Sequence, residues 1–191
     1  MSVAAIEVQP LAPQRLADFL AFFDHDAFVD NRRWQSCYCQ YLHTDHGRVD
    51  WALCTAQQNR AAACQRIEAA RMPGLLAYRD GRVVGWCNAA PLTMLPAYAD
   101  ERADEDAQIG QVGCFVVAPS ARRQGVARAL LSAALGTFRQ QGLRIAQGFP
   151  QRDARSDAQQ HLGPLSLFVD AGFHVHGERD DGTIVVRRNL V

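Results

Sequence analysis

A short polar stretch between an apolar segment and a helix-like segment carries the clearest chemistry in this sequence. The apolar residues 112–118 stop at a proline, and the loop that follows contains Arg122, Arg123, Gly125 and Ala127. A strand that leads through a short loop into a helix makes an anion site, because the first helical N–H groups lack partners and the helix dipole favours negative charge. Small residues at Gly125 and Ala127 would let a pyrophosphate approach the backbone closely. These residues predict a phosphate-binding loop.

A second group of reactive side chains lies between residues 24 and 50. Cys37, Cys39, His43 and His46 are side chains of the types that bind zinc. The Cys-x-Cys spacing is tighter than is usual for zinc sites, and no second matching pair follows. Buried thiols among packed aromatic rings are therefore the favoured interpretation, and we expect no metal.

Hydrophobic periodicity predicts one mixed α/β domain over residues 1–191, with the order β-α-α-β-β-β-α-β-α-β-β. Thr55 and Gln58 have the spacing of a capping box at the start of a helix, and Asp80-Gly81 is a strong hairpin signal. The expected strands are residues 5–11, 75–78, 83–89, 109–118, 143–149, 173–178 and 183–188, and the expected helices are residues 13–23, 55–71, 125–140 and 163–171.

The composition excludes several classes of protein. Lys and Arg number 20, as do Asp and Glu, so the balanced charge removes the electrostatic argument for nucleic acid or an anionic membrane surface. No apolar run is long enough to span a bilayer, and the N-terminus does not resemble a signal peptide. The spacing of the six cysteines does not indicate a disulfide framework, which favours free thiols in the cytoplasm.

The pattern Arg122-x-x-Gly125-x-Ala127 after a strand resembles the acetyl-CoA-binding motif of the GCN5-related N-acetyltransferase (GNAT) superfamily. The order of elements also fits that fold, a mixed central sheet flanked by helices. The resemblance implies that acetyl-CoA is the donor substrate and that its binding core covers about residues 109–175. Backbone groups near Phe115 and Val117 would hold the pantetheine arm, and N–H groups of the loop would hold the pyrophosphate. The implied cofactor-binding residues are Phe115, Val116, Val117, Arg122, Arg123, Gln124, Gly125, Val126, Ala127, Arg128 and Phe168.

The chain departs from the family pattern at two catalytic positions. Many members take a proton from a tyrosine a few residues before a Gly-Phe pair, but Phe168 stands at the matching position and has no hydroxyl. Many also carry a glutamate where this chain has Gln111, which does not titrate. His161 is a candidate proton-transfer group, although a lone histidine near a helix start is more often a surface or capping residue. A non-catalytic acyl-CoA-binding sensor is therefore the alternative.

On the acceptor side, the resemblance implies direct attack on the thioester by a small amine, an amino acid or a peptide amine. In this fold the region after the first helix commonly shapes the acceptor pocket. Trp34 and Tyr38 are candidates for one wall, and Asn88 for the opposite wall. Nearby aspartates are candidates for attracting a cationic amine: Asp24, Asp26 and Asp30. Homodimers are common in the superfamily, but no residue in this sequence identifies an interface.

Overall fold

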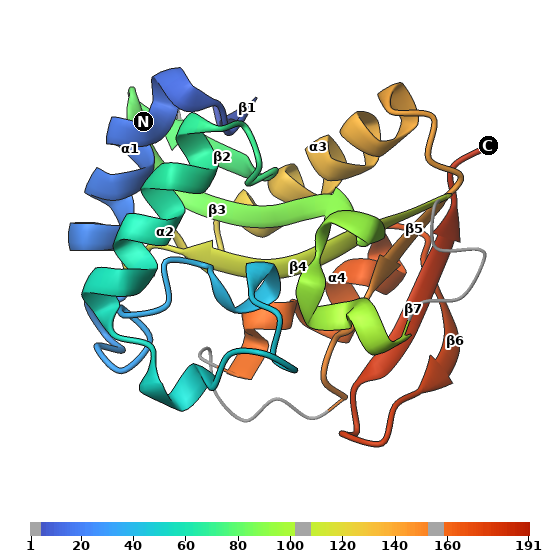
Figure 1. The fold of residues 1–191 in the computed structure, drawn as a ribbon. Coiled ribbons are helices and arrows are strands. Elements are labelled where there is room, and N and C mark those ends of the chain that lie inside the picture. The colour runs from blue at the N-terminus through green and yellow to red at the C-terminus, as the bar shows by residue number, and fades with distance from the viewer. Residues whose placement is uncertain (1–4, 102–107, 153–158) are drawn as a thin grey trace.

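The computed structural model describes residues 5–101, 108–152 and 159–191 (Figure 1). Its strands form one mixed sheet with the spatial order β1-β2-β3-β4-β5-β7-β6. The strands are β1 (Glu7–Pro10), β2 (Leu75–Arg79), β3 (Arg82–Pro91), β4 (Ile109–Val117), β5 (Ile145–Gly148), β6 (His174–Glu178) and β7 (Ile184–Asn189). The α-helices are α1 (Leu16–Ala21), α2 (Ala56–Glu68), α3 (Val126–Gln140) and α4 (Leu165–Asp170). The predicted fold class and the predicted order of strands and helices are confirmed.

Two short sequence signals set the local structure as predicted. Thr55 caps α2: its hydroxyl accepts from the N–H of Gln58 at 3.2 Å, and the Gln58 side chain accepts from the N–H of Thr55 at 2.9 Å. Asp80 and Gly81 have positive φ angles of 52° and 72°, which close the tight turn between β2 and β3. Both signals act within a few residues, so they can be recognised without knowledge of the fold.

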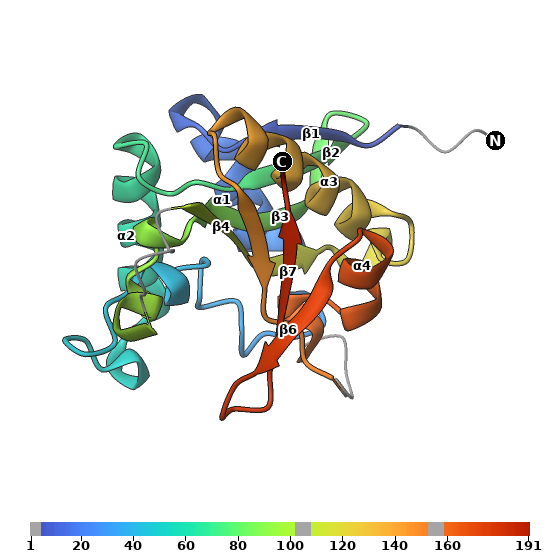
Figure 2. The ribbon, with the colours of Figure 1, turned by 90° about the vertical axis from the view of Figure 1, so that its right-hand side faces the viewer.

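Helices cover both faces of the sheet, with α3 and α4 on one side and α1 and α2 on the other (Figure 2). Glycines let α3 approach closely: a Cβ on Gly85 would lie 2.6 Å from Val126, and one on Gly110 would lie 2.5 Å from Phe138. On the other face, the buried Trp86 packs edge-on against Phe19 of α1. No helix in the described parts of the chain combines the length and apolar character needed to cross a membrane.

The N-terminal third is less regular than predicted. The expected helix over residues 13–23 is a 3-10 turn (Pro13–Arg15), then α1, then a π-helical turn (Phe22–Asp26). Single 3-10 turns at Tyr41–His43 and Trp51–Leu53 interrupt the segment that follows. The expected loop after β3 contains 3-10 helices at Leu92–Met94 and Pro96–Glu101, and its residues 102–107 lie outside the described chain.

Candidate functional site

The pairing between β4 and β5 ends halfway along β4. Their parallel register runs from Ile109 opposite Ile145 to Val112 opposite Gly148. No described strand pairs with the same side of residues 113–117, which we call the open edge of β4. On the other side, residues 115–117 pair with β3, and the register with β3 shifts at residues 113–114. Because peptide N–H and C=O groups need partners, the open edge can bind an extended polar ligand.

The open edge borders a cleft of about 860 Å³, a volume typical of small-molecule sites. Its walls are the end of β4 with the loop into α3, the segment 27–34, and residues 160–167. The predicted site residues that line this cleft are Trp34, Phe115, Val116, Val117, Arg122, Arg123, Gly125, Val126, Ala127, Arg128 and His161. The fold thus brings together residues from three distant parts of the sequence.

The loop between β4 and α3 turns through two residues with positive φ. Arg123 has φ 58°, and Gly125 has φ 85° and is the N-cap of α3. A Cβ added to Gly125 would meet no heavy atom within 4 Å, so the space beside its backbone is open. The first N–H groups of α3, from Val126 to Arg128, have no acceptor within the helix. This arrangement fits a phosphate group in direct contact with the backbone.

The arginines of this loop make different contacts. The Nε of Arg122 donates to the carbonyl of Val117 at 3.2 Å, and its guanidinium forms an ion pair with Asp30 at 2.5 Å. A hydrogen bond from Arg122 lowers the pKa of Asp30. Arg128 is mostly exposed and lies 3.5 Å from Asp170. Arg122 therefore ties the loop to the segment 27–34, and its positive charge is paired with Asp30.

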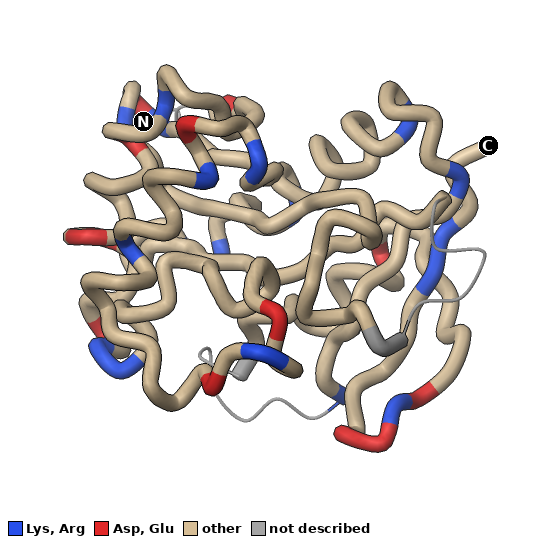
Figure 3. The backbone as a smooth tube through the Cα atoms, viewed as in Figure 1, with Lys and Arg blue, Asp and Glu red and all other residues tan. Residues whose placement is uncertain are grey.

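The aspartates that we expected to attract a cationic amine are all paired with arginines. Their pairs are Asp24 with Arg60 at 2.9 Å, Asp26 with Arg82 at 3.4 Å, and Asp30 with Arg122. The hydrogen bond from Arg60 is the main reason why the pKa of Asp24 is lowered. Figure 3 shows residues of both signs interspersed along the backbone. Each carboxylate therefore has a cationic partner within the protein, and attraction of an amine by these aspartates stays a prediction.

Trp34 and His161 meet within the cleft. Their ring centroids lie 4.5 Å apart, and the ring planes are nearly perpendicular at 81°. Trp34 belongs to the segment 27–34, whereas His161 belongs to the 3-10 helix Gln159–Leu162. An edge-to-face contact of this kind orients an imidazole ring. His161 is also the one histidine among the described residues that line the cleft, and histidine is a common proton-transfer group.

Phe168 does not line the cleft. Its ring is fully buried and packs edge-on against Phe115, at 6.3 Å between centroids, and against Phe173, at 5.1 Å. Gly148 leaves room for it, since a Cβ there would lie 2.5 Å from the ring. The predicted cofactor contact of Phe168 is therefore untested, and its ring supports Phe115, which itself lines the cleft.

Tyr38 and Asn88, the other two predicted acceptor residues, also lie away from the cleft. The Tyr38 hydroxyl donates to Asp24 at 2.6 Å, and burial raises the pKa of Tyr38 to about 12. Asn88 is fully buried, with its Nδ2 2.8 Å from Nε2 of His43. The side chain of Gln124 donates to a carbonyl of its own loop and is not part of the lining. Of the three predicted wall residues, Trp34 lines the described cleft, and so does Asp30 from the group of predicted aspartates.

The sequence did not indicate that several polar side chains on and next to β4 are buried: His43, Gln111 and Gln147. Burial lowers the pKa of His43 to about 4, so this histidine is neutral near pH 7. Gln111 accepts from Gln147 at 3.1 Å, and Gln147 accepts from Arg187 at 2.7 Å. The amide of Gln111 is therefore bound to protein partners. Two glutamines in otherwise apolar strands were the available signal, because buried amides need hydrogen-bond partners.

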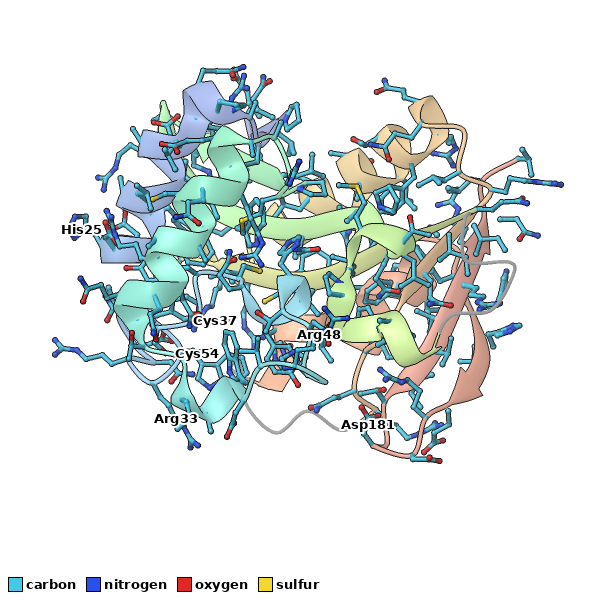
Figure 4. All side chains as sticks on the ribbon, in the orientation of Figure 1. His25, Arg33, Cys37, Arg48, Cys54 and Asp181 are labelled. Carbon is cyan, nitrogen blue, oxygen red and sulfur yellow. The ribbon has the colours of Figure 1, made fainter. Side chains whose placement is uncertain are left out.

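The proposed zinc ligands point toward different neighbours. Cys39 accepts from the indole N–H of Trp86 at 3.0 Å, while His46 bonds to the carbonyl of Tyr41. The adjacent thiol of Cys114 and burial raise the pKa of Cys39 well above its ordinary value. Figure 4 places Cys37 nearer to the sheet than Arg33, which lies at the outer margin of the same segment. Within the described residues, no three His, Cys, Asp or Glu side chains are grouped to hold a metal ion.

Comparison with known proteins identifies similarity over most of the chain. The family model described as acetyltransferase (GNAT) family matches residues 28–163. No curated protein matches the sequence. Among solved structures, yncA of Salmonella typhimurium, determined with its cofactor acetyl-CoA, is 16% identical with a TM-score of 0.58, and the match covers 98% of this chain and 95% of that one.

Two further structures have the same fold. The paia N-acetyltransferase of Thermoplasma acidophilum, determined with coenzyme A, is 11% identical with a TM-score of 0.57, over 97% of this chain and 99% of that one. The GNAT domain of S. lividans PAT is 16% identical with a TM-score of 0.60, over 96% of this chain and 90% of that one. At these identities the likeness concerns the fold.

Proposed function

This chain belongs to the acetyltransferase (GNAT) family, and from that premise we propose that it transfers the acetyl group of acetyl-CoA to a small amine, an amino acid or a peptide amine. The single observation that carries the proposal is the cleft that runs along the open edge of β4 and reaches the N-terminus of α3. A strand edge and a helix N-terminus in one cleft offer hydrogen bonds for amides and contacts for phosphates.

The residues present fit acetyl-CoA from end to end. The N–H groups at the start of α3 and the open backbone at Gly125 would hold the pyrophosphate. The backbone of Phe115 and Val117 would hold the two amides of the pantetheine arm, as a neighbouring strand would. The bound donor supplies a reactive thioester, and the protein supplies its position.

The chemistry requires an uncharged amine and a proton for the departing thiolate. The amine nitrogen attacks the thioester carbon, a C–N bond forms, the C–S bond breaks, and the amine gives up one proton. We assign proton transfer in the cleft to His161, whose ring is oriented by Trp34. Gln111 is hydrogen-bonded within the protein, and Phe168 has no titratable group, so neither supplies this proton.

We also propose a cytoplasmic location. The six cysteines of the sequence are all free thiols in the structure, which supports a reducing compartment. Fractionation of the producing cells would test this location directly.

The test combines two measurements on one preparation. Calorimetric titration with acetyl-CoA measures donor binding, and thiol release with a panel of small amines, amino acids and peptides then measures transfer. Binding followed by thiol release with at least one amine supports the proposal. Binding without release from any amine favours the acyl-CoA sensor, and absence of binding refutes the assignment of the cleft.

A further inference from the structure

Residue 113 on the open edge of β4 is a glycine, and the side chain of Leu42 packs into the space that a side chain at this position would fill. A Cβ added to Gly113 would lie only 2.5 Å from Cδ1 of Leu42, so the leucine can pack here because residue 113 is glycine. Leu42 is buried, and it belongs to a small apolar cluster that includes Leu92, Leu95 and Phe149. The cluster holds the leucine against the strand from behind.

The length of the donor brings its acyl group to this position. The pantetheine arm has about as many backbone bonds between phosphate and sulfur as four residues of extended chain. Four residues of strand span roughly 13 Å. Counted back along the open edge from Val117, next to the phosphate-binding loop, this length ends at Gly113. The thioester of a donor that lies along the open edge is therefore expected beside Leu42.

On the basis of the proposed function, we propose that Leu42 closes the acyl end of the donor site and restricts the donor to acetyl-CoA. The methyl of an acetyl group needs little space beyond the carbonyl carbon. Each additional methylene has to enter the volume that the leucine side chain fills, and a well-packed site resists such an insertion. Leu42 is thus a specificity-determining residue for chain length rather than a catalytic residue.

The side chain of Asn88 is a polar group close to Gly113 and Leu42. Its Oδ1 is buried without a hydrogen-bond partner among the described residues, and it lies 3.6 Å from the Cβ position of Gly113. A longer hydrocarbon chain packed there would keep this oxygen away from any donor, which is unfavourable in a buried site. The polar neighbour and the leucine therefore act in the same direction, against longer acyl groups.

Calorimetric titration of the full chain with acetyl-CoA, butyryl-CoA and hexanoyl-CoA tests this proposal without knowledge of the acceptor. The measured quantity is the ratio of the Kd for butyryl-CoA to the Kd for acetyl-CoA. Leu42→Ala is expected to lower this ratio by about tenfold relative to the unmodified protein, because two methylenes gain a buried place. Leu42→Val removes less volume and is expected to lower the ratio by a smaller factor, which covers the case that the alanine variant unfolds.

Leu135→Ala is the matched control, since Leu135 is a leucine of similar burial that lies on α3 outside this cluster, and its variant is expected to keep the ratio of the unmodified protein. Thermal melting verifies that each variant is folded. If the folded variants at Leu42 bind acetyl-CoA but keep the original ratio, the proposal for Leu42 is overturned and the proposed function stands. If the unmodified protein binds none of the three thioesters, the proposed function fails and this inference fails with it.

Discussion

The two ends of the proposed donor site are built in different ways. The proposed phosphate end, residues 119–128, is a continuous loop and helix start, and the groups that would bind phosphate there are backbone N–H groups around Gly125. The proposed acyl end lies beyond the residues that line the cleft and consists of side chains from distant parts of the chain: Leu42 packs against Gly113, and His43 contacts Asn88. A local backbone site depends on conformation, whereas an assembled side-chain site depends on packing, so substitutions should affect the two ends differently.

The largest expected effect is at the phosphate end. Gly125→Trp should weaken acetyl-CoA binding by at least about a thousandfold, because the bulky residue covers the backbone that the phosphates approach. Gly142→Trp is the matched control: Gly142 follows the other end of α3, also has positive φ, and also has open space around it. Calorimetry should show near-normal affinity in this control. Equal affinity of both variants for acetyl-CoA would refute the backbone site.

At the acyl end, we expect His43 to make the stability of the protein depend on pH. His43 has a pKa of about 4 in the folded protein, below the ordinary value of about 6.5, because burial disfavours its charged form. Between these two pH values His43 is protonated in the unfolded chain but neutral in the folded chain. The free energy of unfolding therefore falls as the pH drops from about 6.5 to about 4. The loss amounts to at most about 3.4 kcal/mol, from a pKa difference of about 2.5 units at about 1.36 kcal/mol each.

His43→Gln keeps a polar side chain beside Asn88 and removes the titration. Urea unfolding at several pH values should show a flatter dependence in this variant than in the unmodified protein. His174→Gln, at an exposed position of β6, should leave the dependence unchanged. If the free energy of unfolding changes with pH in the same way in all three proteins, the buried, neutral state of His43 is contradicted.

His161 lies between the two ends and should separate binding from transfer. His161→Gln is expected to slow thiol release by about a hundredfold, the lower range for loss of a general acid or base, while the Kd for acetyl-CoA stays within about twofold. Trp34→Phe keeps an aromatic ring beside His161 and should cost far less. Unchanged thiol release in the His161 variant would remove this residue from the proton transfer.

The smallest expected effect concerns the ion pair between Asp24, in the π-helical turn Phe22–Asp26, and Arg60 of α2. Asp24 accepts hydrogen bonds from both Arg60 and Tyr38, which lowers its pKa. Its stabilisation is present above the unfolded pKa of about 4 and is lost as the pH falls through the lower folded value. Asp24→Asn should therefore destabilise the protein by about 1 kcal/mol near neutral pH, and by less in acid. Thermal melting of the unmodified protein and the Asp24→Asn variant from neutral pH to acid measures this difference. A difference in stability that grows in acid would contradict the prediction.

The difference between the two ends also explains what could be read from the sequence. The strands, the hairpin at Asp80-Gly81 and the phosphate-binding loop all follow from residues close together in the chain, and their order was predicted. The contact between His43 and Asn88 joins residues 45 positions apart, and no periodicity reports it. The direction of Tyr38 could not be predicted, because it and Cys39 adopt positive φ and turn the chain in a way that neither residue type indicates.

Alternation along β3 predicts that Trp86 and Asn88 face one side, and both side chains indeed interact with Cys39. The burial of Phe168 could not be predicted in the same way, because a six-residue helix has no clear apolar stripe to show which side faces the core.

The open edge of β4 also bears on the solubility of the protein. An unpaired strand edge is a template on which another chain can add a strand, and proteins usually guard such edges against aggregation. Here residues 115–117 lie within a cleft between the segment 27–34 and residues 160–167, so access is restricted to narrow partners. The walls that would hold a thioester along this edge in the proposed function also cover it on both sides, which is one way to protect a strand edge from self-association.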